Sequence, residues 1–389
     1  MKKQHNLIPG LKRAAILMIA IIFLMPICAP GANAANWYQG SSGRWLFRKM
    51  ITIDHTKVLN SNQTNFPVLI SLTDSSLKTI ANGGKVQSIN GYDIIFTDSN
   101  GVTKLDHEIE SYNPATGAII MWVREPTLSY TVDTSLYMYY GNSAISASQE
   151  NKTGVWNTNY TAVWHLKESG NGTSGEFKDS TSNANNGQGG AGTSTKVPTQ
   201  VAAEIGNGQN FNGSQLINAA SVTGISAINA NQTASWWYKV TSNPTDTRNF
   251  FSIIGSSTAN QAAFRSSALA MTQWGGTVTI STTPGTANNW HHVVWTRNGS
   301  TNSIYVDGAL KTTSTTALQT GAASQVIFGS YDTNPNEAYN GILDEVELSN
   351  IALSSNWIST QYNNQSSPST FYSVGIEEWD YSLFFMFFF

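Results

Sequence analysis

Acidic residues at every second position from 106 to 110 are the first feature of this chain that could do chemistry. Asp106, Glu108 and Glu110 alternate with other residue types, so in a β-strand the three carboxyl groups share one face. At a rise of about 3.3 Å per residue, neighbouring acids lie about 6.6 Å apart, near the separation of glycosidase carboxyl pairs. The row is a candidate for general acid–base catalysis. A solvated strand face explains the same alternation without catalysis.

Other catalytic chemistries find no support in the sequence. The six histidines are scattered, and only His291 and His292 are adjacent. Neighbours on a strand face opposite ways, so these two cannot easily chelate one metal ion. No serine lies in a nucleophile-elbow motif, and no phosphate-binding loop is present. The acidic row is therefore the single candidate for a catalytic site.

Residues 1–34 are typical of a secretory signal peptide. Basic residues precede an apolar run over residues 14–27, and Ala32-Asn33-Ala34 forms a small-residue cleavage site. The run is shorter than the roughly 20 residues that a membrane span needs. A lipid anchor on Cys28 is the alternative, but Ile27 is bulky where lipidation signals take a small residue. We expect a secreted or cell-surface chain without a membrane span, cysteine or disulfide in its mature form.

The charge balance argues against nucleic acid as a partner. The signal peptide holds four of the 21 basic residues and none of the 24 acidic ones, which leaves a mature net charge of −7. Such a chain has no basic patch for nucleic acid or anionic lipid. Only 12% of the residues are charged, and Ser, Thr, Asn and Gly separate short apolar runs. This composition suits an extracellular β protein with many turns.

The spacing of apolar residues predicts an all-β chain with two antiparallel β-sandwich domains. Alternating runs bounded by turn residues predict strands in two groups, at 45–54, 66–73, 92–97, 104–112, 118–124 and 134–140, and at 235–240, 250–254, 268–273 and 325–328. Turns at Asn298-Gly299 and Asp307-Gly308 divide 290–313 into a meander of three strands. We expect domains over 43–150 and 155–376, one short helix over 353–362 capped by Ser354 or Ser355, and an irregular apolar tail over 377–389.

Two motifs in the second domain resemble laminin-G-like domains of the concanavalin A-like lectin/glucanase superfamily. These are Trp290-His-His-Val with Tyr305-Val-Asp-Gly, and Gly341-Ile-Leu-Asp-Glu-Val-Glu-Leu. The first domain is similar to the domain of unknown function 2341, through segments that include Trp45–Lys49, His107–Glu110 and Tyr137–Asn142. The resemblance implies that the second domain is a jelly roll. Function stays open, because lectins, adhesion modules, glycosidases and spacers share this sandwich.

The resemblance also implies candidate binding residues. Asp179 lies in a loop similar to the Asp-Ser-Ser-Gly-Asn loop of laminin-G-like domains, and Asp344 lies in the closing motif. Calcium, where this family binds it, lies near these loops, and its oxygen preference suits both carboxylates. Alternatively, the two acids only stabilise turns and strand ends. Trp237 aligns with a tryptophan common in the family. Trp236 and Tyr238 would stack on a ligand if the Trp237 face packs the core, and are core residues otherwise.

These observations favour a secreted, non-catalytic protein of a prokaryotic cell surface that binds a glycan or a surface protein. A binding-type fold without a convincing catalytic constellation is the reason. The alternatives are a glycoside hydrolase that acts on an extracellular polysaccharide through the acidic row, and a purely structural envelope module.

Overall fold

The computed structural model describes residues 36–380 except 42, 229–230, 256–258, 274–276 and 318–320. The predicted signal peptide and the Phe-rich end of the chain lie outside the described residues. All elements belong to the unit Trp37–Phe389. No helix among the described residues has the length and hydropathy of a membrane span.

The first region is a sandwich of a four-stranded and a three-stranded antiparallel sheet. The four-stranded sheet has the order β26-β3-β8-β5, and the three-stranded sheet has the order β4-β7-β6. The strands are β3 (Phe47–Ile53), β4 (Gln63–Thr73), β5 (Ile95–Asp98), β6 (His107–Asn113), β7 (Ala118–Leu128), β8 (Thr134–Tyr140) and β26 (Tyr372–Trp379). All six strands predicted here are confirmed. A separate ribbon pairs β1 (Gln39–Gly40) with β2 (Gly43–Arg44).

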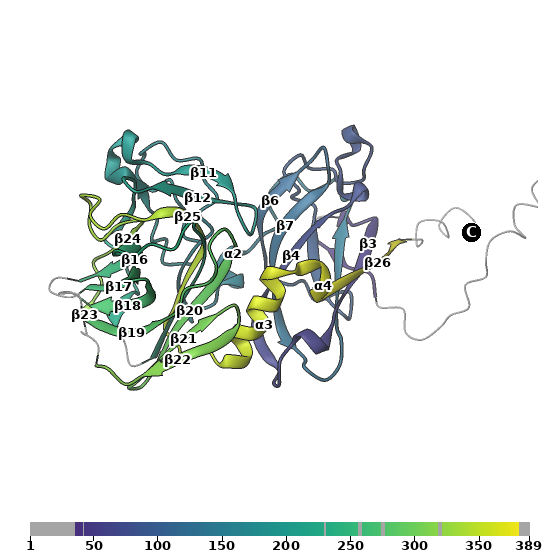
Figure 1. Ribbon diagram of the computed structural model, residues 1–389. Helices are drawn as coiled ribbons and strands as arrows, with labels where there is room; N and C mark the ends of the chain where they lie inside the picture. The colour runs from purple at the N-terminus through teal and green to yellow at the C-terminus, as the bar shows by residue number, and fades with distance from the viewer. Residues whose placement is uncertain are drawn as a thin grey trace, which may run out of the picture. The chain divides into compact units, whose positions relative to one another are not determined.

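The last strand of the chain returns to the first sandwich. β26 pairs antiparallel with β3, for example through Tyr372 opposite Ile53 and Trp379 opposite Phe47, and Figure 1 shows these two strands side by side. The predicted boundaries at 155–376 and 377–389 are therefore wrong at this end. The sandwich needs a strand on the open edge of β3, and the chain supplies it from more than 300 residues away.

The second region is a larger sandwich whose sheets have the orders β10-β13-β24-β16-β17-β18-β19 and β11-β12-β25-β15-β20-β21-β22, with β9 also paired to β25. The first sheet contains β10 (Gln188–Gly189), β13 (Ile217–Ala220), β16 (Arg248–Ile254), β17 (Ala259–Arg265), β18 (Ala268–Gln273), β19 (Val278–Thr282) and β24 (Gln325–Phe328). The second contains β9 (Tyr160–Trp164), β11 (Thr199–Ala202), β12 (Asn207–Asn212), β15 (Asn231–Lys239), β20 (His291–Asn298), β21 (Thr301–Val306), β22 (Ala309–Ser314) and β25 (Asn340–Ser349).

Short elements complete the structure: β14 (Ser226–Ile228) pairs with β23 (Gly321–Ala322), and the helices are α2 (Lys152–Val155), α3 (Ser355–Ser366) and α4 (Pro368–Phe371). The 3₁₀ turns are η1 (His55–Lys57), η2 (Ser75–Leu77), η3 (Ile80–Asn82), η4 (Gly190–Gly192) and η5 (Ser194–Lys196). The predicted helix is confirmed as α3, although it ends four residues later than expected. Its N-cap is Ser354, whose hydroxyl accepts a hydrogen bond from the Trp357 N–H at 3.2 Å.

Separate apolar cores fill the two sandwiches. Leu343, Val346 and Leu348 of β25 point into the second core, while alternate residues of β3, β4, β7 and β8 fill the first. A third buried cluster contains Leu69 and Trp122 of the first region, Trp156 after α2, and Val163 and Ile205 of the second. Residues of the two sandwiches thus pack against one another in an apolar contact.

Candidate functional site

The acidic row of β6 lies beside this contact. Asp106, just before the strand, forms an ion pair with Arg124 and remains partly exposed. Glu108 and Glu110 are buried, with 4% and 5% of their surface exposed. Both reach the same side chain, His165, so they share one face of the strand as predicted.

His165 stands at the centre of the buried group. It follows β9 directly, and its ring is 2% exposed. Its Nε2 lies 3.3 Å from Glu108 Oε2. Its Nδ1 lies 2.8 Å from Glu345 Oε2 and 3.7 Å from Glu110 Oε2. The imidazole therefore joins carboxyl groups of both sandwiches.

A β-bulge brings Glu345 to the imidazole. In the pairing of β25 with β15, Ser235 lies opposite Glu347 and Trp237 opposite Asp344, so two residues of β25 face Trp236 alone. Glu345 takes a φ of 47° in this bulge. A non-glycine residue in this left-handed conformation costs on the order of 1–3 kcal/mol, which the surrounding structure has to offset.

Neutral donors surround the carboxyl groups. Trp156 Nε1 donates to Glu108 Oε2 and Ser180 Oγ donates to Glu108 Oε1, both at 2.6 Å. Trp122 Nε1 donates to Glu110 Oε2 at 2.8 Å. The rings of Trp122 and His165 stack with centroids 5.7 Å apart. Indole N–H groups and one hydroxyl thus stabilise negative charge without adding positive charge.

Burial raises the pKa values of some acids in this group, while the charge of His165 lowers that of Glu108. Burial alone would raise the pKa of Glu108, but the charge of His165 and the hydrogen bonds of its neighbours lower this pKa to about 2. Burial would lower the pKa of His165, but the charges of Glu345 and Glu108 hold it well above its usual value. Burial raises the pKa of Glu345 to about 8 and that of Glu347 to about 7. Glu108 and His165 are therefore the ion pair of the group.

This arrangement does not fit glycoside hydrolysis in the described state. A glycosidase needs both carboxyl groups beside a bond of a bound sugar, with room for water or a covalent intermediate. Glu108 and Glu110 instead face indole rings and an imidazole in the interior. Asp106 is held by Arg124 and by the Asn151 amide, which donates to its Oδ1 at 2.8 Å. The catalytic use of this row thus finds no support in its geometry.

Trp236 and Tyr238 cannot stack on a ligand in this structure, which corrects the sequence-based prediction. Both point into the second core, with 1% and 0% of their surface exposed. Trp236 packs on Phe251 with ring centroids 5.1 Å apart, and Tyr238 packs on Phe250 at 5.0 Å. The opposite face of β15 is covered as well, because Trp237 donates to Gln365 Oε1 of α3 at 2.7 Å.

Asp179 organises its own loop. Its Oδ1 accepts hydrogen bonds from the N–H groups of Val163 and Thr181, both at 2.9 Å. Its Oδ2 accepts from the Thr181 hydroxyl at 2.9 Å and from the Asn185 N–H at 2.8 Å. Four donors around one buried carboxylate are the arrangement of a turn-stabilising aspartate. Calcium binding through Asp179 and Asp344 stays a prediction.

Two other groups of side chains have the spacing to hold a metal ion among the described residues. Asp54, His55 and Asp133 form a group at the surface. Glu110, His165 and Glu345 form a buried group, in which the potential ligand atoms all lie within 4.8 Å of one another. The sequence alone did not predict His165 and Glu345 as site residues. The second acid of Asp-Glu-Val-Glu was the available signal for Glu345.

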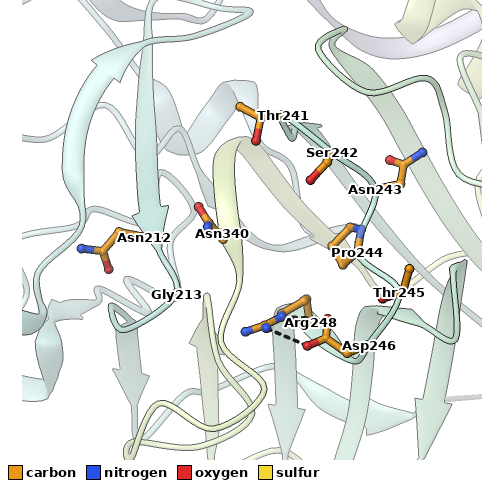
Figure 2. Close-up of a pocket in the computed structure, with 10 residues that line it drawn as sticks. All are labelled: Asn212, Gly213, Thr241, Ser242, Asn243, Pro244, Thr245, Asp246, Arg248 and Asn340. Carbon is orange, nitrogen blue, oxygen red and sulfur yellow. Dashed lines mark hydrogen bonds and ion pairs between the residues drawn. The ribbon is translucent and has the colours of Figure 1, made fainter.

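An open pocket of about 690 Å³ lies where several strands of the second sandwich begin or end. Its walls come from the end of β12, the loop between β15 and β16, and the first residue of β25 (Figure 2). Ten residues line it: Asn212, Gly213, Thr241, Ser242, Asn243, Pro244, Thr245, Asp246, Arg248 and Asn340. Amide and hydroxyl groups predominate, and aromatic side chains are missing from this lining.

One charged pair is fixed in the pocket wall. Arg248 Nε and Nη2 donate to the two carboxylate oxygens of Asp246 at 3.0 and 2.6 Å, as Figure 2 shows. Arg248 Nη1 donates to the Ala338 carbonyl at 3.0 Å. Such a bidentate pair has fixed geometry, so the pocket presents oriented polar groups that remain accessible to solvent.

The models of two protein families each match a part of the chain. Residues 90–165 match the model of the Domain of unknown function (DUF2341), and residues 211–359 match that of the Concanavalin A-like lectin/glucanases superfamily. The chain therefore joins a DUF2341 region to a concanavalin A-like domain. Glu108, Glu110 and His165 fall in the DUF2341 match, and Glu345 falls in the concanavalin A-like match. The buried group thus links the two family segments.

Several solved structures are similar to part of this chain. The botulinum neurotoxin serotype G binding domain has 14% identity and a TM-score of 0.42 over 54% of this chain and 52% of its own. The binding domain of Paraclostridial Mosquitocidal Protein 1 has 16% identity and a TM-score of 0.42, with 52% of each chain covered. Domain 4 of the arabinanase AbnA from Geobacillus stearothermophilus, in complex with arabinotriose, has 15% identity and a TM-score of 0.38 over 53% of this chain and 98% of its own.

The chain spans about half the length of the two toxin binding domains that it matches. No curated protein matches the sequence.

Proposed function

We propose that this chain is a secreted, non-catalytic protein of a prokaryotic cell surface whose concanavalin A-like domain binds glycan. The observation that carries the proposal is the open pocket at the ends of β12, β15, β16 and β25. Its size falls within the range of ligand sites, about 300–1,000 Å³. The buried acids of β6 support the non-catalytic part of the proposal.

The chemistry of the pocket suits a polyhydroxylated ligand. Side-chain amides both donate and accept hydrogen bonds, and hydroxyl groups do the same. Asn340, Asn212 and Thr241 are exposed around the opening. Asp246 offers accepting oxygens, while its pairing with Arg248 offsets its charge. A neutral sugar therefore fits this lining better than a charged ligand.

Glycan-array binding of the full chain, followed by titration of any glycan found, tests this proposal. We expect Asn340→Ala and Asp246→Ala to weaken binding by about 1 kcal/mol or more each, because each removes hydrogen bonds to the ligand. Asn298→Ala is the matched control, since Asn298 lines a different hollow of about 380 Å³.

If binding survives both pocket substitutions, or if Asn298→Ala also weakens it, the glycan site is not in this pocket. The absence of binding to every glycan and envelope fraction would favour a structural module.

A further inference from the structure

The buried group at His165 contains many more acids than bases. Its carboxyl groups belong to Glu108, Glu110, Asp344, Glu345 and Glu347, and among the described residues each ion pair of this group involves His165. The nearby ammonium of Lys167 is directed to the backbone carbonyl of Glu110 at 2.7 Å. Uncompensated carboxylates are costly in an interior, so protons or a further cation have to balance them.

Glu110 of β6, Glu345 of β25 and His165, which follows β9, converge on one another. His165 Nδ1 faces Glu345 Oε2 at 2.8 Å and Glu110 Oε2 at 3.7 Å. Ligand atoms around a four-coordinate cation lie about 3.3 Å apart when each bond is about 2.0–2.1 Å. The two observed distances bracket that value, so a small shift of side chains accommodates an ion.

Asp344 gives an independent indication of a cation site. This side chain is fully buried, and its Oδ2 accepts from the Ile205 N–H at 2.9 Å. Its Oδ1 has no hydrogen-bond partner. An ionised carboxylate oxygen without a partner is costly in an interior. A positive ion beside this oxygen removes the problem.

The turn after β11 holds Asp344 beside the converging ligands. A Cβ atom on Gly208 would lie 3.3 Å from Asp344 Cβ, and one on Gly206 would lie 2.9 Å from Glu110 Oε1. The turn and the start of β12 therefore lie against both acids. Glycine at 206 leaves space for the Glu110 carboxyl group, since Gly206 also takes a φ of 57°.

We propose that Glu110, His165 and Glu345 bind a divalent first-row transition metal ion, Zn²⁺ or Mn²⁺, with Asp344 as the nearby third carboxylate. One imidazole with two or three carboxylates is a donor set for these ions. Calcium takes oxygen ligands, so it suits this set less well. Because the ligands come from both sandwiches, the ion is structural and joins the DUF2341 region to the concanavalin A-like domain.

Metal binding by the full chain tests the proposal directly. After treatment with a chelator and its removal, the wild-type protein should bind one equivalent of Zn²⁺ or Mn²⁺, and the melting temperature should rise. Co²⁺ in the same site should give a visible absorption spectrum of nitrogen and oxygen ligation. Glu110→Gln and Glu345→Gln keep side-chain volume, and each should weaken binding by about tenfold or more.

Asp133→Asn is the matched control, because Asp133 belongs to the surface group with Asp54 and His55. This variant should bind metal as the wild type does. Two results would overturn the proposal: a wild-type chain that binds none of the three ions, whatever the variants do, or binding that Asp133→Asn removes and Glu345→Gln retains. X-ray absorption of the Zn²⁺-loaded wild type provides a check that needs no variant, since one imidazole ligand is expected.

Discussion

Burial of His292 makes the free energy of unfolding depend on pH. The ring is 1% exposed and packs on Trp237 with ring centroids 5.0 Å apart. Burial lowers the pKa of His292 to about 3, whereas an unfolded chain has a value near 6.5. Below pH 6.5 the unfolded state therefore binds a proton at this ring and the folded state does not. Acid thus lowers the free energy of unfolding.

We expect this effect to disappear in His292→Gln. Between pH 7 and pH 5, the wild type should lose about 2 kcal/mol of unfolding free energy relative to the variant. Urea denaturation of both proteins at each pH measures the difference. The difference should stay constant between pH 7 and pH 8, and a constant difference down to pH 5 would show that the folded state also protonates this ring.

Residue types alone could not reveal the His165 group. Strand alternation correctly placed Glu108 and Glu110 on one face. The same alternation puts Asp344 and Glu345 on opposite faces, and only the bulge with its φ of 47° changes this. The burial of Trp236 and Tyr238 could not be predicted from the sequence either. The Trp237 face of β15 is covered by α3, and the position of α3 depends on the whole fold.

At the scale of elements, turn chemistry made local strands predictable. Asn298-Gly299 and Asp307-Gly308 divide β20, β21 and β22 as expected, and Asp307 and Gly308 both have positive φ. The return of β26 was not predictable. Buried and exposed residues do not alternate clearly along β26. Its pairing with β3 also joins segments that are far apart in the sequence.

This return can be tested with two residues at the end of the chain. Phe371 is fully buried in the first core, while Ile376 on β26 is 87% exposed. We expect Phe371→Ala to lower the free energy of unfolding by about 3–5 kcal/mol. Ile376→Ala should change it by less than about 0.5 kcal/mol. Equal effects in urea denaturation would mean that residues 371–379 do not belong to the first sandwich.

At the level of the whole molecule, α3 forms hydrogen bonds with strands of both sandwiches. Asn364 of this helix accepts from the Leu69 N–H at 2.7 Å and donates to the Leu69 carbonyl at 3.1 Å. Leu69 belongs to β4, an edge strand of the first region. A side-chain amide thus satisfies two backbone groups that would otherwise be buried without partners.

Asn364→Ala should cost about 2–4 kcal/mol of unfolding free energy, because both Leu69 groups lose their partners. The matched substitution Asn363→Ala removes one partly buried hydrogen bond to the Lys57 carbonyl. It should lower the free energy of unfolding by less than about 1.5 kcal/mol. Thermal unfolding followed by calorimetry compares the two variants. If Asn364→Ala is as stable as Asn363→Ala, the helix does not hold β4 in this way.

We infer that this molecule binds glycan and does not cleave it. An incubation of the full chain with a panel of extracellular polysaccharides, in which retention of the protein and release of reducing ends are recorded together, tests this claim most directly. We expect retention on at least one polysaccharide without release of reducing ends. Reducing ends that the wild type releases and that Glu108→Gln fails to release would contradict the claim and make the β6 acids catalytic.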